Sequence, residues 1–130
     1  MKELMAELML IASSISGQYD LPMPTSIMWS NDPQLEGYQM NAYGRTLCRV
    51  HNRENVCLII IHHCVVDVDK RFAKQVITHE MAHYVDFATS GKADGHSKLW
   101  ARIMRERGFS ANVTAPFKKA CSKHLKPKRA

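Results

Sequence analysis

The chain has 130 residues, of which 45% are hydrophobic and 23% charged. This length suits one ordinary domain, and this composition excludes a disordered or fibrous protein. The net charge of +6 is uneven, because residues 1–97 carry 8 Lys and Arg against 11 Asp and Glu, a net of −3, whereas residues 98–130 carry 10 against 1, a net of +9. Such a basic C-terminal region favours a polyanionic partner, nucleic acid before membrane.

The first apolar stretch, residues 4–15, is interrupted by Glu7 and is too short to span a bilayer of about 30 Å. A signal peptide would need a small-residue cleavage site after a basic start, and none follows here. We therefore expect residues 2–16 to form an amphipathic helix that covers the core. We also expect an intracellular protein of the cytoplasm or nucleoid, or of the host cytoplasm if a phage encodes it.

The middle of the chain has the pattern of a small antiparallel sheet. Residues 26–29 are expected to form a short extended piece, and residues 38–50 a longer one with Gly44 as a bulge or turn point. Residues 52–55 (NREN) are turn-like, and residues 56–61 (VCLIII) form the continuous β-branched run of a buried strand.

Two helices are predicted after the sheet, which makes the chain an α+β protein. Residues 70–89 carry apolar side chains at the i, i+3, i+4 spacing of a helix packed on one face, with Asp67 or Asp69 as its cap. The sequence SGKADG breaks this helix, and a second one is expected from position 96 or 97 to about 107. Gly108 then provides the C-cap.

The four cysteines contain no CxxC pair, which excludes a zinc ribbon or a redox motif built from local spacing. They are Cys48, Cys57, Cys64 and Cys121. The first two can face each other across a hairpin. In a reducing compartment, however, we expect all four to be free and mostly buried thiols.

Residues 79–83 read HEMAH, which fits the pattern H-E-x-x-H in a predicted helix. Positions i and i+4 lie on nearly the same helix face, so His79 and His83 can converge on one zinc ion. Glu80 is then placed to deprotonate a water on the metal. The pattern therefore predicts the site of a zinc hydrolase.

A catalytic zinc needs a third protein ligand and an open fourth position. The metzincin pattern is excluded, because Asp86 and Thr89 stand where that pattern needs glycine and histidine. Three residues that follow in the sequence are candidates for the third ligand, and we prefer His96 to Asp94 and Glu106. Glu106 lies between two arginines in a charged stretch.

HEMAH, a gap of twelve residues and then GHSKLW resemble the SprT-like domain, which bacterial SprT proteins share with eukaryotic Spartan proteases. The pattern of that domain is HExxH, a short variable stretch, and a histidine with an aromatic residue four positions on. His96 and Trp100 match this second element. The resemblance covers residues 38–108 and is most specific over residues 79–100.

The resemblance implies a zincin-like fold with zinc held by His79, His83 and His96 and with Glu80 as the general base. It also implies cleavage of proteins attached to DNA, and we expect this DNA to be single-stranded or to contain junctions. Many relatives carry a C-terminal zinc ribbon that this chain lacks. The basic stretch KKACSKHLKPKRA is expected to make the DNA contact instead.

We thus expect a zincin domain over residues 1–109 and a basic tail over 110–130, with a protein substrate, DNA as partner and no membrane partner. A function of another class stays open, namely a zinc-containing nucleic-acid-binding or regulatory module without proteolytic activity. A structural zinc would not need Glu80 and is usually closed by a fourth Cys or His. A hydrolase of small peptides or cell walls fits the basic tail poorly.

Overall fold

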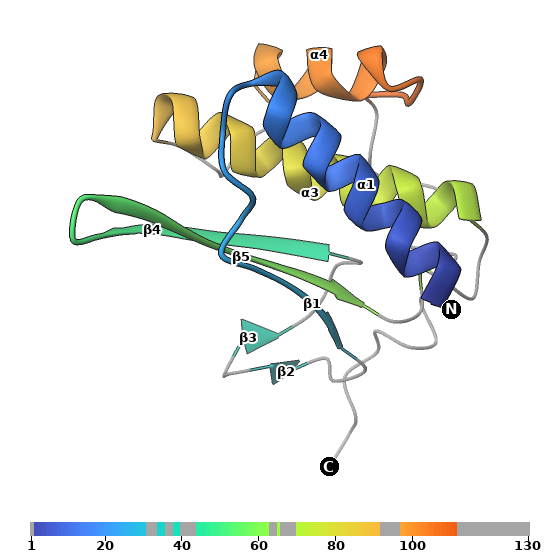
Figure 1. Cartoon of the computed structure of the whole chain (residues 1–130), viewed down its shortest axis with the longest axis horizontal. Helices are drawn as coiled ribbons and strands as arrows, with labels where there is room; N and C mark the ends of the chain where they lie inside the picture. The colour runs from blue at the N-terminus through green and yellow to red at the C-terminus, as the bar shows by residue number, and fades with distance from the viewer. Residues whose placement is uncertain are drawn as a thin grey trace.

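Within the residues that the computed structural model describes, three helices lie on one side of a three-stranded sheet (Figure 1). The described residues are 2–30, 34–35, 38–39, 44–62, 65, 70–91 and 97–111. The elements in chain order are α1 (Lys2–Gln18), β1 (Ser26–Ser30), β2 (Gln34–Leu35), β3 (Tyr38–Gln39), β4 (Gly44–His51), β5 (Glu54–His62), α3 (Lys70–Ser90) and α4 (Lys98–Glu106). The predicted α+β class is confirmed.

The sheet has the strand order β1-β5-β4 and is mixed, whereas the sequence predicts a wholly antiparallel sheet. β5 pairs antiparallel with β4 and parallel with β1. The chain reverses direction between β1 and β4 and again at the β4–β5 hairpin, so β5 runs in the same direction as β1. β5 lies between the other two strands. The short strands β2 and β3 pair with each other in a separate antiparallel ribbon.

The β4–β5 hairpin turns through Asn52 and Arg53, both of which have positive φ angles, of 51° and 66°. Positive φ at both central residues is the requirement of a type I′ turn, which matches the twist of the strands that it joins. Asparagine tolerates this left-handed region, but a long side chain with a Cβ atom does not adopt it readily. Arg53 therefore holds a strained position at the tip of the hairpin.

Replacing Arg53 with Gly is expected to raise the free energy of unfolding by about 1 kcal/mol, because glycine adopts positive φ without the Cβ clash. Urea denaturation of the two proteins measures the difference. Asn52→Gly is the matched control and should give a smaller gain, since asparagine already accepts this conformation. An unchanged or lower stability of Arg53→Gly would contradict the assignment of strain to the Cβ atom.

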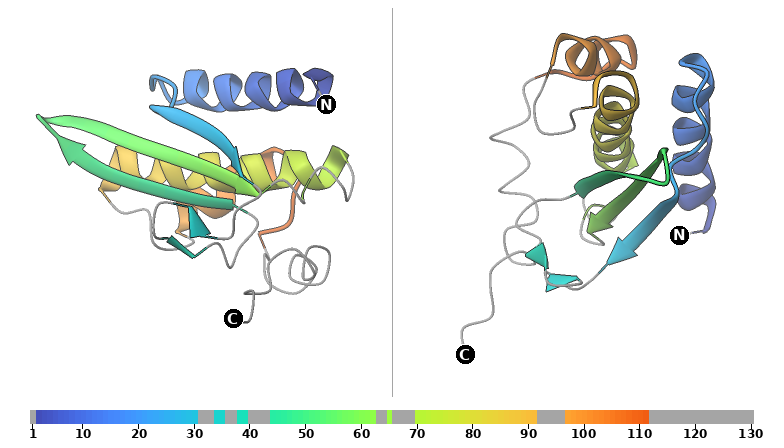
Figure 2. Two further views of the ribbon diagram at one scale, coloured as in Figure 1. Left: turned by 90° about the horizontal axis from the view of Figure 1, so that it is seen from below. Right: turned by 90° about the vertical axis from the view of Figure 1, so that its left-hand side faces the viewer.

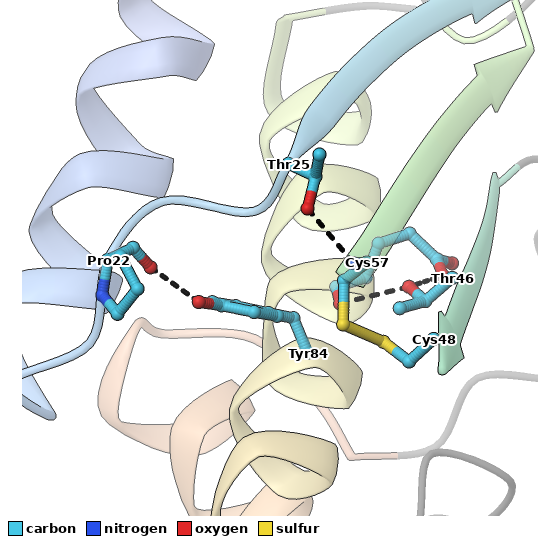
Figure 3. The surroundings of a disulfide bond; sticks show 7 residues. Pro22, Thr25, Thr46, Cys48, Cys57 and Tyr84 are labelled. Carbon is cyan, nitrogen blue, oxygen red and sulfur yellow. Dashed lines mark hydrogen bonds between the residues drawn. A yellow bond between two sulfur atoms is a disulfide. The ribbon is translucent and has the colours of Figure 1, made fainter. Parts of the chain in front are cut away.

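A disulfide joins Cys48 of β4 to Cys57 of β5 (Figure 3). The predicted pairing across the hairpin is confirmed, but the predicted thiol state is wrong for these two residues. The register places them directly opposite each other, and opposite side chains on one face of an antiparallel pair are close enough to bond. Cys57 is buried in the core beneath the helices. The other two cysteines lie outside the described residues.

The helices begin and end close to where the sequence predicts. α1 continues two residues beyond the predicted end, and the chain turns at Asp20, whose φ is 54°. α3 ends before Gly91, and Gly108 after α4 has a φ of 83°, as a C-cap glycine should. The predicted caps Asp67 and Asp69 lie outside the described residues.

α3 is the central helix of the fold, with α1 beside it, α4 on one side and the sheet on the other (Figure 2). Because neighbours surround it, its middle section is buried on several faces, and polar residues are buried there together with apolar ones. The core of the described residues draws on α1 (Leu8, Ala12, Ile15), β5 (Cys57, Ile59, Ile61), α3 (Val76, Ile77, Met81, Val85) and α4 (Trp100, Ile103, Met104). None of the described helices is both long and apolar enough to span a membrane.

Candidate metal centre

The middle of α3 brings His79 and His83 together, one helical turn apart as their spacing predicts. Their Nε2 atoms are 3.2 Å apart, and their ring centroids are 4.8 Å apart with an interplanar angle of 70°. The side chain of His79 is 15% exposed, whereas His83 is buried. The two nitrogens therefore converge on one point beside the helix.

The separation of the two nitrogens fits a shared zinc ion. Imidazole nitrogens bind zinc at about 2.0–2.1 Å in tetrahedral geometry, which places two of them about 3.3 Å apart. The observed Nε2–Nε2 distance of 3.2 Å is close to this value. Imidazole is also a donor that zinc prefers, so the residues present fit the metal in both distance and chemistry.

The preferred candidate for a third ligand lies outside the described residues. Among the described residues, no group of three or more His, Cys, Asp or Glu side chains is placed to hold a metal. His96, the preferred candidate, lies outside those residues, as does Asp94. Glu106 is described: its side chain is 48% exposed and lies 3.8 Å from Arg102, which agrees with the solvated role expected for it.

Glu80 points from α3 toward the edge strand β4 and is only 4% exposed. Its Oε2 atom lies 3.8 Å from Nε2 of His79, so one carboxylate oxygen is directed to the same side as the histidine pair. Its other oxygen, Oε1, accepts a hydrogen bond of 2.7 Å from the hydroxyl of Thr46. The carboxylate is thus held beside the histidine pair.

Burial raises the pKa of Glu80 from 4.5 to about 7, while the Thr46 hydrogen bond and the positive charge of Arg45 act in the opposite direction. A base with a pKa near the working pH is the best compromise between being ionised and holding a proton. A divalent cation bound nearby would lower the pKa of Glu80 again, because it favours the ionised carboxylate.

The raised pKa predicts how the stability of the metal-free protein depends on pH. The neutral carboxyl is favoured in the folded state, so its contribution is complete below pH 4.5 and is lost as the pH rises through about 7. Relative to Glu80→Gln, the wild type should lose roughly 3 kcal/mol between these limits. Urea denaturation of both proteins from pH 4 to 8 with a chelator measures this difference, and a pH-independent difference would contradict the burial effect.

Gly44, at the start of β4, packs directly against Glu80. A Cβ atom at this position would lie 2.9 Å from Cγ and 3.0 Å from Oε2 of Glu80. The separation from Cγ is shorter than real Cβ contacts show, so the side chain of Glu80 would have to shift if position 44 carried a Cβ atom. The sequence identifies Gly44 only as a bulge or turn point and gives Thr46 no role. The signal that could have identified both residues is the alternation of side chains along a strand, which puts positions 44, 46 and 48 on one face.

Trp100 of α4 supports the histidine pair from the other side. Its indole N–H donates a hydrogen bond of 3.2 Å to the carbonyl of His79, and its ring lies edge-on to the His79 imidazole at 5.0 Å. Ser97 caps α4 by accepting a hydrogen bond from the backbone N–H of Trp100. Trp100 therefore packs α4 against α3, and the contact also fixes the first histidine.

Three further residues with polar groups are buried, namely Tyr84, Asp86 and His62. Tyr84 donates a hydrogen bond to the carbonyl of Pro22 (Figure 3). Asp86 lies in α3 and is 5% exposed. His62 is buried at the end of β5 rather than on the surface. His63 lies outside the described residues.

Comparison with protein families agrees with this geometry. The model of the SprT-like family matches residues 21–120, which is most of the chain and includes β4, α3 and α4.

The chain belongs to the SprT-like family.

SprT-like proteins are generally associated with zinc metallopeptidase activity. Comparisons with curated proteins and with solved structures find no match. The SprT-like match begins after α1, yet α1 packs on α3 and contributes to the core. In this SprT-like chain, α1 therefore supports the helix that carries the HExxH sequence.

Proposed function

We propose that the chain is a zinc-dependent metalloendopeptidase of the HExxH type that cleaves proteins associated with or crosslinked to DNA. The observation that carries the proposal is the convergence of the His79 and His83 nitrogens at 3.2 Å, beside the buried carboxylate of Glu80. His79, His83 and His96 are the proposed zinc ligands. Zinc, when bound, polarises the scissile carbonyl and makes a neighbouring water more acidic.

Glu80 performs the proton transfers in this proposal. Its Oε2 atom, on the side of the histidine pair, accepts a proton from the attacking water. The same oxygen then gives the proton to the leaving amine as the peptide bond breaks. Burial raises the pKa of Glu80 and so favours the protonated form between these steps.

The position of Glu80 also argues against a zinc-binding module without proteolysis. Burial of a carboxylate is costly, and the hydrogen bond from Thr46 offsets only part of the cost for Glu80, which is buried next to the histidine pair. A structural zinc site gains nothing from a carboxylate that is not a ligand. A general base, in contrast, needs this placement.

Exposed cations on α4 support the nucleic-acid part of the proposal. Lys98, Arg102 and Arg105 recur at i, i+4 and i+7, so they share one face of the helix. All three line an open hollow of about 620 Å³. We define these residues as the α4 basic face and propose that it binds phosphates together with the basic tail, residues 110–130, most of which lie outside the described residues.

Titration with single-stranded DNA at several salt concentrations tests this part. Replacing Lys98 and Arg105 together with Gln should weaken binding and reduce the slope of log affinity against log salt by about 0.7 for each phosphate that the variant no longer neutralises. Arg49→Gln, a change of an exposed cation on β4, is the matched control. If the double variant binds DNA with the affinity and slope of the wild type, the α4 basic face is not part of the DNA site.

The proteolytic part is tested with a protein crosslinked to single-stranded DNA. The zinc-loaded chain should cleave the crosslinked protein faster than the same protein without DNA, because binding to the DNA raises the local substrate concentration. Equal rates with and without DNA would limit the proposal to a peptidase without DNA targeting.

A further inference from the structure

The edge strand β4 holds the side chain of Glu80 through two residues on one face. Thr46 binds the carboxylate at Oε1, and Gly44 leaves the space in which the carboxylate lies. β4 is itself fixed to β5 by the strand ladder and by the disulfide at Cys48, two residues beyond Thr46. The carboxylate is therefore positioned from the sheet as well as from its own helix.

The Thr46 hydroxyl has two acceptors on the same glutamate. It lies 2.7 Å from Oε1 and 3.1 Å from the backbone carbonyl oxygen of Glu80. When Glu80 is ionised, the hydroxyl can donate a hydrogen bond to Oε1. When Oε2 carries a proton, Oε1 is a carbonyl oxygen and can still accept the hydrogen bond from the hydroxyl. One side chain thus suits both protonation states.

We propose that Thr46 is a positioning residue for Glu80, which fixes Oε1 so that Oε2 stays directed toward the histidine pair, while Gly44 keeps the adjoining space open. This inference rests on the proposed function, since it assigns Glu80 the role of base. It differs from a merely structural role for Thr46, because the hydrogen bond acts on the orientation of one reacting group.

The test compares Thr46→Val with Thr46→Ser in the full zinc-loaded chain. Valine keeps the shape but removes the hydroxyl, whereas serine keeps the hydroxyl. Thr46→Val should lower kcat by about 10- to 100-fold with KM and zinc content unchanged, as expected for loss of one hydrogen bond to a charged group. Thr46→Ser should recover most of the wild-type kcat. A kcat for Thr46→Val within about twofold of the wild type, or equal losses in the two variants, would overturn the proposal.

Gly44→Ala provides a second variant that does not alter any hydrogen-bonding group. Its Cβ atom would enter the space beside Glu80, so kcat should fall while zinc content is retained. Gly17→Ala in α1 is the matched control, because a Cβ atom there meets nothing within 4 Å, and it should leave kcat unchanged. If Gly44→Ala is as active as the wild type, the close contact with Glu80 has no role in catalysis.

Crystal structures of the metal-free variants give a readout that needs no activity. The Glu80 carboxylate should keep its place in Thr46→Ser and turn away in Thr46→Val, and an unmoved carboxylate in Thr46→Val overturns the positioning role. If the wild type cleaves no protein at all, the proposed function fails. The structures still decide whether Thr46 orients Glu80, so the two failures are distinguishable.

Discussion

Replacing Glu80 with Gln is expected to lower the rate of protein cleavage by about 10²- to 10⁴-fold while zinc stays bound. Glutamine has the same shape and can still accept the Thr46 hydrogen bond at its amide oxygen, but it cannot accept a proton from water. The measurement is kcat of the zinc-loaded protein together with zinc content. A loss of activity with equal zinc isolates the proton transfer from the binding of the metal.

Glu106→Gln is the matched control for this prediction. Glu106 is exposed and lies near Arg102, so its replacement should leave cleavage and zinc content as they are in the wild type. Full cleavage by Glu80→Gln with zinc bound would show that another group activates the water, and the proposed mechanism would then be wrong.

Replacing His83 with Ala is expected to abolish tight zinc binding and, with it, cleavage. His83 supplies one of the two converging nitrogens, and a single imidazole from α3 cannot hold the metal in tetrahedral geometry. At free zinc of 100 times the dissociation constant, the wild type should gain about 2.7 kcal/mol in its free energy of unfolding. His83→Ala should gain almost nothing, as measured by urea denaturation with buffered zinc.

Two comparisons sharpen the zinc measurement. His51→Ala changes an exposed histidine at the end of β4 and should respond to zinc as the wild type does. His96→Ala and Glu106→Ala separate the alternatives for the third ligand, and only the first should lose the stabilisation. Undiminished stabilisation of His83→Ala by zinc would contradict the assignment of the histidine pair.

The parts of the fold that the sequence predicts well are those set by local spacing. The helix that carries His79 and His83 follows from a repeat of 3.6 residues, and the buried strand β5 follows from its β-branched run. The capping glycine at position 108 follows from its place after the last apolar residue of α4. Each of these features depends on residues that lie close together in the sequence.

The parts that the sequence misses depend on contacts between distant segments. The parallel pairing of β1 with β5 depends on which strand lies in the middle of the sheet, and this order joins segments that are far apart in the sequence. The state of Cys48 and Cys57 depends on their being opposite each other, and the assumption of a reducing compartment led to the wrong state. The contact of Thr46 with Glu80 joins residues 34 positions apart.

The candidate site shows the same division. The HExxH spacing alone predicts convergence of the two histidines, and the structure places their nitrogens 3.2 Å apart. The burial of Glu80, which sets its pKa, depends on β4 lying against α3 and could not be predicted from the spacing. Side-chain environment, rather than motif, is therefore what the structure adds to the site.

If zinc makes this chain a peptidase, an unfolded protein should release new amino termini when it is incubated with the zinc-loaded chain. The zinc-loaded wild type, incubated with the protein in the presence of single-stranded DNA, should generate new α-amines. Release should stop when zinc is removed by a chelator and resume when zinc is restored. Release that continues unchanged without zinc, or no release under any of these conditions, would show that the chain is not a zinc-dependent peptidase.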